Sequence, residues 1–148
     1  MITVELINEI DCDFLPLEKE FQQWIHAVTH FIPTNNLHLC ITIVDEAESA
    51  VLNESYRQKK GPTNVLSFNY EKIPGITADS LGDLAICAAV VKTEATTQRK
   101  TLQSHFAHMT IHGALHLLGY DHIQDTEAEK MEALEIKIME KLGFENPY

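Results

Sequence analysis

The pattern of apolar and polar positions along this chain switches between strand-like and helix-like stretches. Short alternating or continuous apolar runs predict strands at residues 2–7, 37–44, 65–68 and 84–87. Recurrence at helical spacing predicts helices at about residues 17–31, 46–56, 88–97, 102–118 and 126–142. This order of elements favours an α+β fold in which several α-helices, one of them a central histidine-bearing helix, pack on a small mixed β-sheet.

Individual residues define the faces and ends of these helices. Pro33 is expected to end the first one, whose buried face we expect to be Leu17, Phe21, Trp24, Ile25 and Val28. Asp45 is expected to cap the second helix, with Val51 and Leu52 on its inner face. Thr126 and Glu129 form a capping box for the last helix. The core face of that helix is expected to hold Met131, Leu134, Ile138 and Leu142 before Gly143 closes it.

Length and composition predict one domain over residues 1–148. The 148 residues are 45% hydrophobic, which is enough for a core of ordinary size. No apolar run approaches the roughly 18 residues of a membrane span, and the first residues lack the basic start of a signal peptide. We therefore expect a cytoplasmic protein with no membrane partner. Its odd number of cysteines, without pairing motifs, fits reduced thiols: Cys12, Cys40 and Cys87.

Three histidines near the C-terminus stand at a spacing that suits one metal ion. His112 and His116 are four residues apart on an expected helix, so their side chains project from one face. Gly119 is expected to end this helix in a left-handed turn, after which His122 can return to the same point. Three nitrogen ligands leave a tetrahedral zinc one position for water, as in catalytic sites. The spacing predicts one zinc ion, although imidazole also suits nickel, copper and iron.

The neighbours of these histidines narrow the chemistry. The spacing is that of the metzincin proteases, but Gly113 stands where those enzymes carry the glutamate base, which disfavours peptide hydrolysis by that mechanism. Glycine in a helix costs roughly 1 kcal/mol relative to alanine, so Gly113 indicates either a bulky group approaching the helix or a packing requirement. Asp121 is a candidate to orient a ligand imidazole or to accept a proton, and equally a turn residue. His105 and His108 are candidates for partners of the ligands, RNA contacts, spare ligands or half-buried packing residues.

Charge is distributed unevenly along the chain. The formal net charge of −11 disfavours a phosphate-rich partner by itself. Residues 1–56 hold one basic and ten acidic side chains, residues 57–100 hold seven and four, and residues 101–148 hold three and eight. The basic middle segment either faces a phosphate backbone or is a solvated surface.

Within that segment, Arg57, Lys59 and Lys60 are the candidate RNA-binding residues. Arg57 can offer two parallel hydrogen bonds to a phosphate and stabilise the charge of a transition state, or it makes an ordinary surface salt bridge.

Several segments together resemble the YbeY family of bacterial ribosomal-RNA-processing endoribonucleases: Leu52-Asn53, Tyr56-Arg57, Pro62 to Phe68, Leu81-Gly82-Asp83 and His112 to His122. The resemblance implies a zinc-dependent endoribonuclease that cuts single-stranded RNA, not DNA. Its expected roles are the maturation of 16S RNA of the ribosomal small subunit and ribosome quality control. It also implies a zincin-like site in which His112, His116 and His122 bind the metal, with His116 and Arg57 as catalytic residues. Family sequences often carry aspartate where this chain has Lys60, which makes the loop more basic here.

Two other functions stay open at this stage. One is a zinc peptidase or amidase with an unrecognised base, and the other is a non-enzymatic ribosome-assembly factor whose zinc braces the fold. For a nuclease, attack by water and attack by the neighbouring 2′-hydroxyl are both open, and the general base is not identified.

Overall fold

The computed structural model describes residues 1–69, 80–121 and 123–148. The elements of these ranges follow in chain order: β1 (Ile2–Ile7), α1 (Glu18–Phe31), β2 (Leu37–Val44), α2 (Glu46–Arg57), β3 (Val65–Phe68), β4 (Ser80–Cys87), α3 (Ala88–Thr97), α4 (Leu102–Leu117) and α5 (Asp125–Lys141). The predicted α+β class is confirmed. The strand boundaries predicted for β1, β2 and β3, and the helix boundaries predicted for α3, match the structure.

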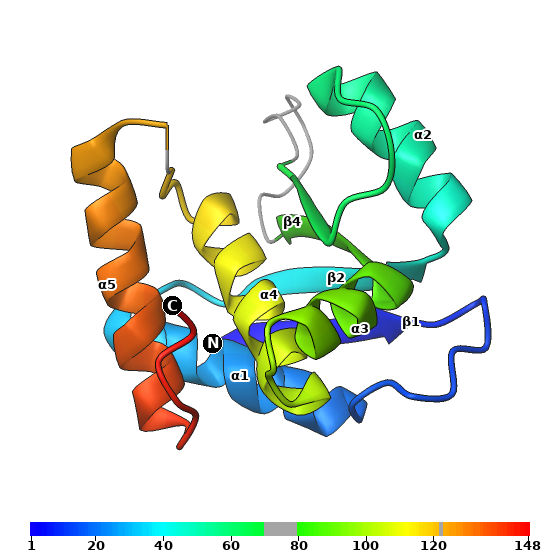
Figure 1. Cartoon of the computed structure of the whole chain (residues 1–148). Coiled ribbons are helices and arrows are strands. Elements are labelled where there is room, and N and C mark those ends of the chain that lie inside the picture. The colour runs from blue at the N-terminus through cyan, green and yellow to red at the C-terminus, as the bar shows by residue number, and fades with distance from the viewer. Residues whose placement is uncertain (70–79, 122) are drawn as a thin grey trace, which may run out of the picture.

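The strands form one mixed sheet in the order β1-β2-β4-β3 (Figure 1). β1 pairs with β2 and β2 with β4 in parallel, whereas β3 runs antiparallel to β4 with Val65 opposite Ile86. Successive residues of β4 point to opposite faces, so Leu84 and Ile86 join the main core while Ala85 and Cys87 join a smaller cluster. This order places β3 at a sheet edge, where it contacts α4.

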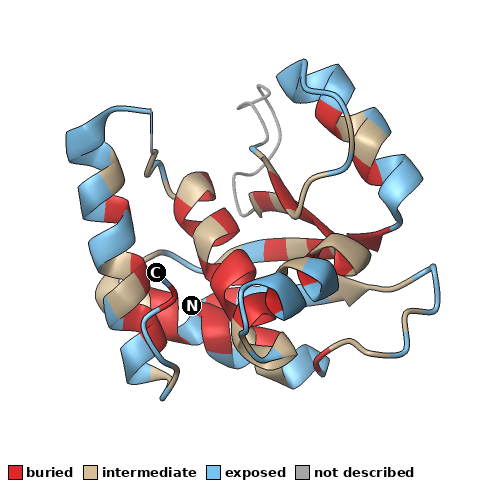
Figure 2. Cartoon of the chain, viewed as in Figure 1, coloured by how far each residue is buried: buried red, intermediate tan, exposed pale blue. Residues whose placement is uncertain are grey.

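Helix α4 lies at the centre of the main core, as the dense apolar content of its sequence predicts. Figure 2 shows buried residues around most of its circumference. It packs against α1, α3, α5 and the strands β3 and β4. The largest fully buried side chains of this core include Phe21, Phe106, Ile25, Leu39, Ile41, Ile111 and Leu115. A rigid, buried α4 fixes the position of the histidines that it carries.

Helix α2 packs differently from the prediction. Asp45 caps it as expected, because its Oδ1 accepts a hydrogen bond from the backbone N–H of Glu48 at 2.8 Å. Val51, however, is 62% exposed, so its assignment to the inner face was wrong. The buried residues are Ser49 and Asn53, which bond the loop before β3. Polar contacts to that loop, in addition to apolar packing, hold the helix in place.

Those polar contacts are well defined. The hydroxyl of Ser49 donates to the Thr63 carbonyl and accepts from the Thr63 N–H, both at 3.0 Å. The side-chain amide of Asn53 donates to the Gly61 carbonyl at 2.9 Å. Leu52, partly buried as expected, packs on the smaller hydrophobic cluster. The loop and α2 therefore form one unit that reaches β3.

Two helix starts also differ from the prediction. Leu17 is 58% exposed because it is the N-cap of α1 and lies outside its buried stripe, whereas the other four predicted core residues of that helix are buried. Helix α5 begins at Asp125, with Gln124 as an N-cap that makes no side-chain capping bond. The capping box of Thr126 and Glu129 was therefore wrong, because both residues already lie inside the helix.

Strand β4 is longer than expected. It begins at Ser80, four residues before the predicted start at Leu84, because the polar residues at its beginning pair with β2 despite their weak apolar pattern. Pro74 and Gly75 in the sequence predict a hairpin connection or a mobile flap between β3 and β4, and this segment lies outside the described residues. Helix α4 ends at Leu117, one residue short of the prediction. In the parts of the chain that are described, no helix is both long and apolar enough to cross a membrane.

Candidate metal centre

Helix α4 ends in a turn that orients one of the predicted ligands. Gly119 has φ +101°, a left-handed conformation that suits glycine, as the sequence predicts. Its N–H donates to the His116 carbonyl and the Tyr120 N–H donates to the Leu115 carbonyl, both at 3.0 Å, which is the Schellman pattern. The chain thereby reverses, and the Tyr120 carbonyl comes within 3.1 Å of His116 Nδ1. Because a carbonyl can only accept, this contact places the Nδ1 proton on His116.

Two of the three predicted ligands face each other. The Nε2 atoms of His112 and His116 lie 3.1 Å apart, and the ring centroids are 4.6 Å apart. The Nδ1 atom of His112 lies 2.6 Å from Glu135 Oε1, so this nitrogen donates to a carboxylate. When both Nδ1 atoms carry protons, both Nε2 atoms of the neutral rings are acceptors. The structure therefore brings two nitrogen lone pairs together at one point.

Glu135 of α5 holds this arrangement from behind. Its side chain is fully buried, and its second oxygen accepts from His108 Nε2 at 2.7 Å and from the Tyr148 hydroxyl. Burial alone would raise the pKa of Glu135, but the hydrogen bonds from His108 and His112 outweigh it and lower the pKa to about 2. Glu135 is therefore a carboxylate, which fixes the proton of His112 on Nδ1.

The donor set fits a metal ion. Two nitrogens bound to one tetrahedral zinc at 2.0–2.1 Å stand roughly 3.3 Å apart, close to the 3.1 Å between the facing Nε2 atoms. Outer hydrogen bonds from the remaining ring nitrogens to a carboxylate and a carbonyl are those that metal-binding histidines ordinarily make. A cation between the two lone pairs would also relieve their repulsion.

The third predicted ligand, His122, lies outside the described residues. Across the described ranges, no three histidine, cysteine, aspartate or glutamate side chains gather in a way that could hold a metal. His122 as the third ligand therefore stays a prediction. Cys12 and Cys40 are partly buried free cysteines, and Cys87 is a buried one.

The two histidines open onto a cleft of about 970 Å³ between α2, β3 and α4. Arg57, the last residue of α2, lines this cleft together with His112, His116 and Asp121. The structure thus brings Arg57 to the candidate ligands although 55 positions separate it from His112 in the sequence. Arg57 is exposed. Among the described residues it forms no salt bridge, which was the alternative role predicted for it.

The other predicted RNA-binding residues lie elsewhere. Lys59 and Lys60 are exposed in the loop that follows α2, and neither lines the cleft. They stand beyond the left-handed residue Gln58, which ends the helix. Their role in RNA binding therefore stays a prediction, and the structure places both side chains outside the cleft.

Gly113 is explained by packing. A Cβ at this position would lie 2.8 Å from Leu84 Cδ2 and 3.2 Å from Val65 Cγ2, and Leu84 is fully buried. The carbonyl of Gly113 also accepts a hydrogen bond from Ser67 Oγ at 3.0 Å. Of the two reasons for a glycine here, the close approach of α4 to the sheet is the one the structure shows. These contacts hold α4 close to β3 and β4 at the residue next to His112.

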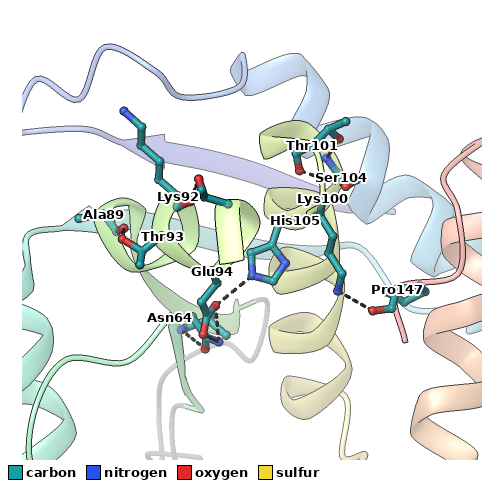
Figure 3. A network of polar contacts seen from close by, with 12 residues as sticks. Asn64, Ala89, Lys92, Thr93, Glu94, Lys100, Thr101, Ser104, His105 and Pro147 are labelled. Carbon is teal, nitrogen blue, oxygen red and sulfur yellow. Dashed lines mark hydrogen bonds and ion pairs between the residues drawn. The ribbon is translucent and has the colours of Figure 1, made fainter. Parts of the chain in front are cut away.

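His105 and His108 are buried partners of carboxylates. His105 Nε2 lies 2.9 Å from Glu94 Oε1, and Glu94 also accepts hydrogen bonds from the side-chain amide of Asn64 (Figure 3). Burial lowers the pKa of His105, against the opposing effect of Glu94. Because Asn64 lines the cleft, Glu94 of α3 connects the cleft wall to α4. His108 shares Glu135 with His112, so it is a partner of a candidate ligand, one of the roles considered for it.

Glu135 is the site residue that sequence reasoning missed. It lies among Met131, Leu134 and Ile138, where the helical spacing places core residues. A carboxylate at a core position is costly unless it is paired. That conflict between charge and position is the signal that would have identified it.

Comparison with known proteins supports the nuclease resemblance. The family model described as Endoribonuclease YbeY matches residues 5–143. Proteins named Endoribonuclease YbeY from Coxiella burnetii strains Dugway 5J108-111 and RSA 331 / Henzerling II are each 52% identical over 150 residues, covering 100% of this chain and 99% of theirs. The solution structure of TM1509 from Thermotoga maritima matches with a TM-score of 0.59 and 24% identity over 97% of this chain and 92% of that one, which shows likeness of fold.

Proposed function

The chain belongs to the Endoribonuclease YbeY family, and on that premise we propose that it cuts single-stranded RNA with zinc in the maturation of 16S ribosomal RNA. The observation that carries the proposal is the pair of facing Nε2 atoms, 3.1 Å apart, on a cleft that Arg57 also lines. The family makes the protein a metal-dependent hydrolase acting on RNA. The proposal adds that the metal is zinc, that the RNA is single-stranded, and which residues bind the metal and the RNA.

His112, His116 and His122 are the proposed ligands of one zinc ion. When bound, zinc supplies a Lewis acid that polarises a phosphoryl oxygen and makes water more acidic. Glu135 and the Tyr120 carbonyl keep the proton of each described ligand on Nδ1, so that Nε2 stays an acceptor. The site thus needs no rearrangement of these two rings before it binds the ion.

The remaining cleft residues act on the substrate. Arg57 is proposed to hold the phosphate through its guanidinium and to stabilise negative charge that develops during cleavage. Asp121, on the cleft wall, is proposed to orient a ligand ring or to accept a proton. Lys59 and Lys60 are proposed to attract the RNA backbone outside the cleft, within a chain whose net charge is −11.

The proposed partner is the ribosomal small subunit, in the cytoplasm, with a further role in ribosome quality control. An acidic protein with a locally basic edge is suited to approach RNA through one surface only. The peptidase alternative loses its support, because family membership favours RNA and Gly113 is occupied with packing. An assembly factor with a structural zinc is the alternative that an activity measurement separates.

The test is cleavage of an end-labelled single-stranded RNA by protein stripped with chelator and then reconstituted with zinc. His116→Ala is the test variant, and His26→Ala, at an exposed position of α1, is the matched control. Activity that returns with zinc in wild type and His26→Ala but not in His116→Ala supports the proposal. Equal cleavage by all three proteins indicates a contaminating nuclease.

Two further results of the same assay are informative. No cleavage by zinc-loaded wild type, combined with a His116→Ala variant that loses both metal and fold, supports the structural-zinc alternative. The product ends decide the route, because a cyclic phosphate requires attack by the 2′-hydroxyl and excludes direct attack by water.

A further inference from the structure

Tyr56 is a large aromatic side chain left in water at the wall of the cleft. It lies in the last turn of α2, directly before Arg57, and it is 64% exposed. Its ring meets Phe68, at the end of β3, edge to face, with centroids 4.8 Å apart and planes at 69°. Both rings line the cleft that His112 and His116 line.

The ring of Tyr56 has a firm support. Phe68 is only partly buried, and its inner side packs on the smaller hydrophobic cluster of the sheet: Val44, Leu66, Ala85 and Cys87. Ring pairs in this geometry contribute about 0.5–1.5 kcal/mol beyond the burial of area, so the contact holds Tyr56 in place. A scattered surface tyrosine needs no explanation, but one fixed on a second ring at a cleft wall is a preformed flat surface.

The charged residue beside the two aromatic rings indicates which class of ligand they suit. Arg57 stands next in the chain and lines the same cleft, so a cation for a phosphate lies beside a flat apolar face. A nucleotide has that combination of groups, a base with a π-face and an anionic phosphate. An apolar peptide would use the rings and leave Arg57 unused, and a free anion would do the reverse.

We propose that Tyr56 and Phe68 form a nucleobase-binding subsite, which receives a base of single-stranded RNA while Arg57 holds an adjoining phosphate. The inference rests on the proposed function, because it takes RNA as the substrate. It also gives a physical reason for the proposed preference for single-stranded RNA. Bases in a duplex already stack on their neighbours and are paired, so none is available to the ring.

The test measures affinity without cleavage. Metal-stripped full-length protein is titrated into a fluorescein-labelled uridine oligonucleotide, and into an oligonucleotide of equal length with abasic riboses, and the anisotropy gives Kd. Tyr56→Leu keeps apolar bulk but removes the ring, and it should weaken binding of the uridine oligonucleotide roughly 5- to 150-fold. Tyr56→Phe keeps the ring and should restore the wild-type affinity to within about twofold. Abasic RNA should bind wild type and Tyr56→Leu equally.

The outcomes separate this inference from the proposed function. Equal affinity of wild type and Tyr56→Leu for the uridine oligonucleotide overturns the subsite, as does a loss of the same size on abasic RNA. Zinc-dependent cleavage of the uridine oligonucleotide is measured in parallel with His116→Ala as the control. If cleavage is absent but the Tyr56 effect is present, the proposed nuclease activity fails and the base-binding subsite stands. If wild type binds neither oligonucleotide, both fail.

Discussion

Replacing Glu135 with glutamine exchanges one oxygen for an NH₂ group in a buried cluster. The wild-type carboxylate accepts hydrogen bonds from His108, His112 and Tyr148, and its side chain is fully buried. A glutamine side chain has one acceptor oxygen, so its NH₂ must face at least one of these donors. If it faces His112, that ring is driven to the other tautomer, and its Nε2 acquires a proton and can no longer bind a metal.

The magnitude follows from the contacts. A hydrogen bond to a charged group contributes about 1.5–3 kcal/mol and a neutral one about 0.5–1.5 kcal/mol, so two histidine contacts lose about 2 kcal/mol together. A buried donor left facing NH₂ adds about 1–3 kcal/mol. We therefore expect the free energy of unfolding of metal-free Glu135→Gln to be about 3–5 kcal/mol below that of wild type. Losing the group that orients a ligand typically weakens metal binding about 10- to 100-fold.

The assay has two arms. Urea unfolding of the metal-free proteins, followed by circular dichroism, gives the stability change, and competition with a chromogenic chelator gives the zinc affinity at a temperature where both proteins are folded. Glu140→Gln, at an exposed position of the same helix, is the matched control and should change neither quantity. An unchanged zinc affinity in folded Glu135→Gln would refute the role assigned to Glu135, whatever its effect on stability.

Three other perturbations test separate parts of the structure. Because burial lowers the pKa of His105 below its ordinary 6.5, the free energy of unfolding should decrease as pH drops below about 6.5. Urea midpoints measured from pH 7 to 5 should show this decrease in wild type and a smaller decrease in His105→Gln. Gly82→Ala should cost about 3 kcal/mol in thermal unfolding, since φ is +144° and a Cβ would lie 2.4 Å from the Phe68 carbonyl oxygen; a loss under about 0.5 kcal/mol contradicts this. Arg57→Ala should lower zinc-dependent RNA cleavage about 100-fold at unchanged stability, with Arg57→Lys recovering only part; full activity excludes the phosphate role.

Features set by neighbours in the sequence were predictable. The cap of Asp45 and the left-handed turn at Gly119 both act within a few residues, and both appear where the sequence places them. The alternation from Leu37 to Val44 gave β2 with its observed boundaries, because strand and turn signals stand side by side there. Such features depend on local propensity, which a single sequence carries.

Features set by contacts across the fold were not predictable. Val51 has the apolarity of a core residue, but α2 is held by Ser49 and Asn53 through a loop, and the hydropathy pattern does not show such a contact. The start of β4 at Ser80 depends on pairing with β2, which overrides a weak local pattern.

In the candidate site, too, the residues related by local spacing were predictable and a residue brought in across the fold was not. The spacing of His112 and His116 on one helix was sufficient to predict their convergence. Arg57 was expected to act with them, on resemblance, and the fold places it on their cleft. Glu135 was missed because it meets His112 across 23 positions and two helices, a distance over which sequence periodicity gives no information.

The turn at Gly119 has a consequence for how inactive variants are interpreted. Gly119 has no side chain, yet the reversal that it permits delivers the Tyr120 carbonyl to His116. A genetic screen that scores lost activity should therefore recover substitutions at Gly119 beside those at the histidines. A purified variant of this kind would keep the sheet and the core while the imidazole of His116 turns freely. In such a screen, loss of function at Gly119, which has no reactive side chain, would report that the imidazole of His116 is no longer held in its orientation.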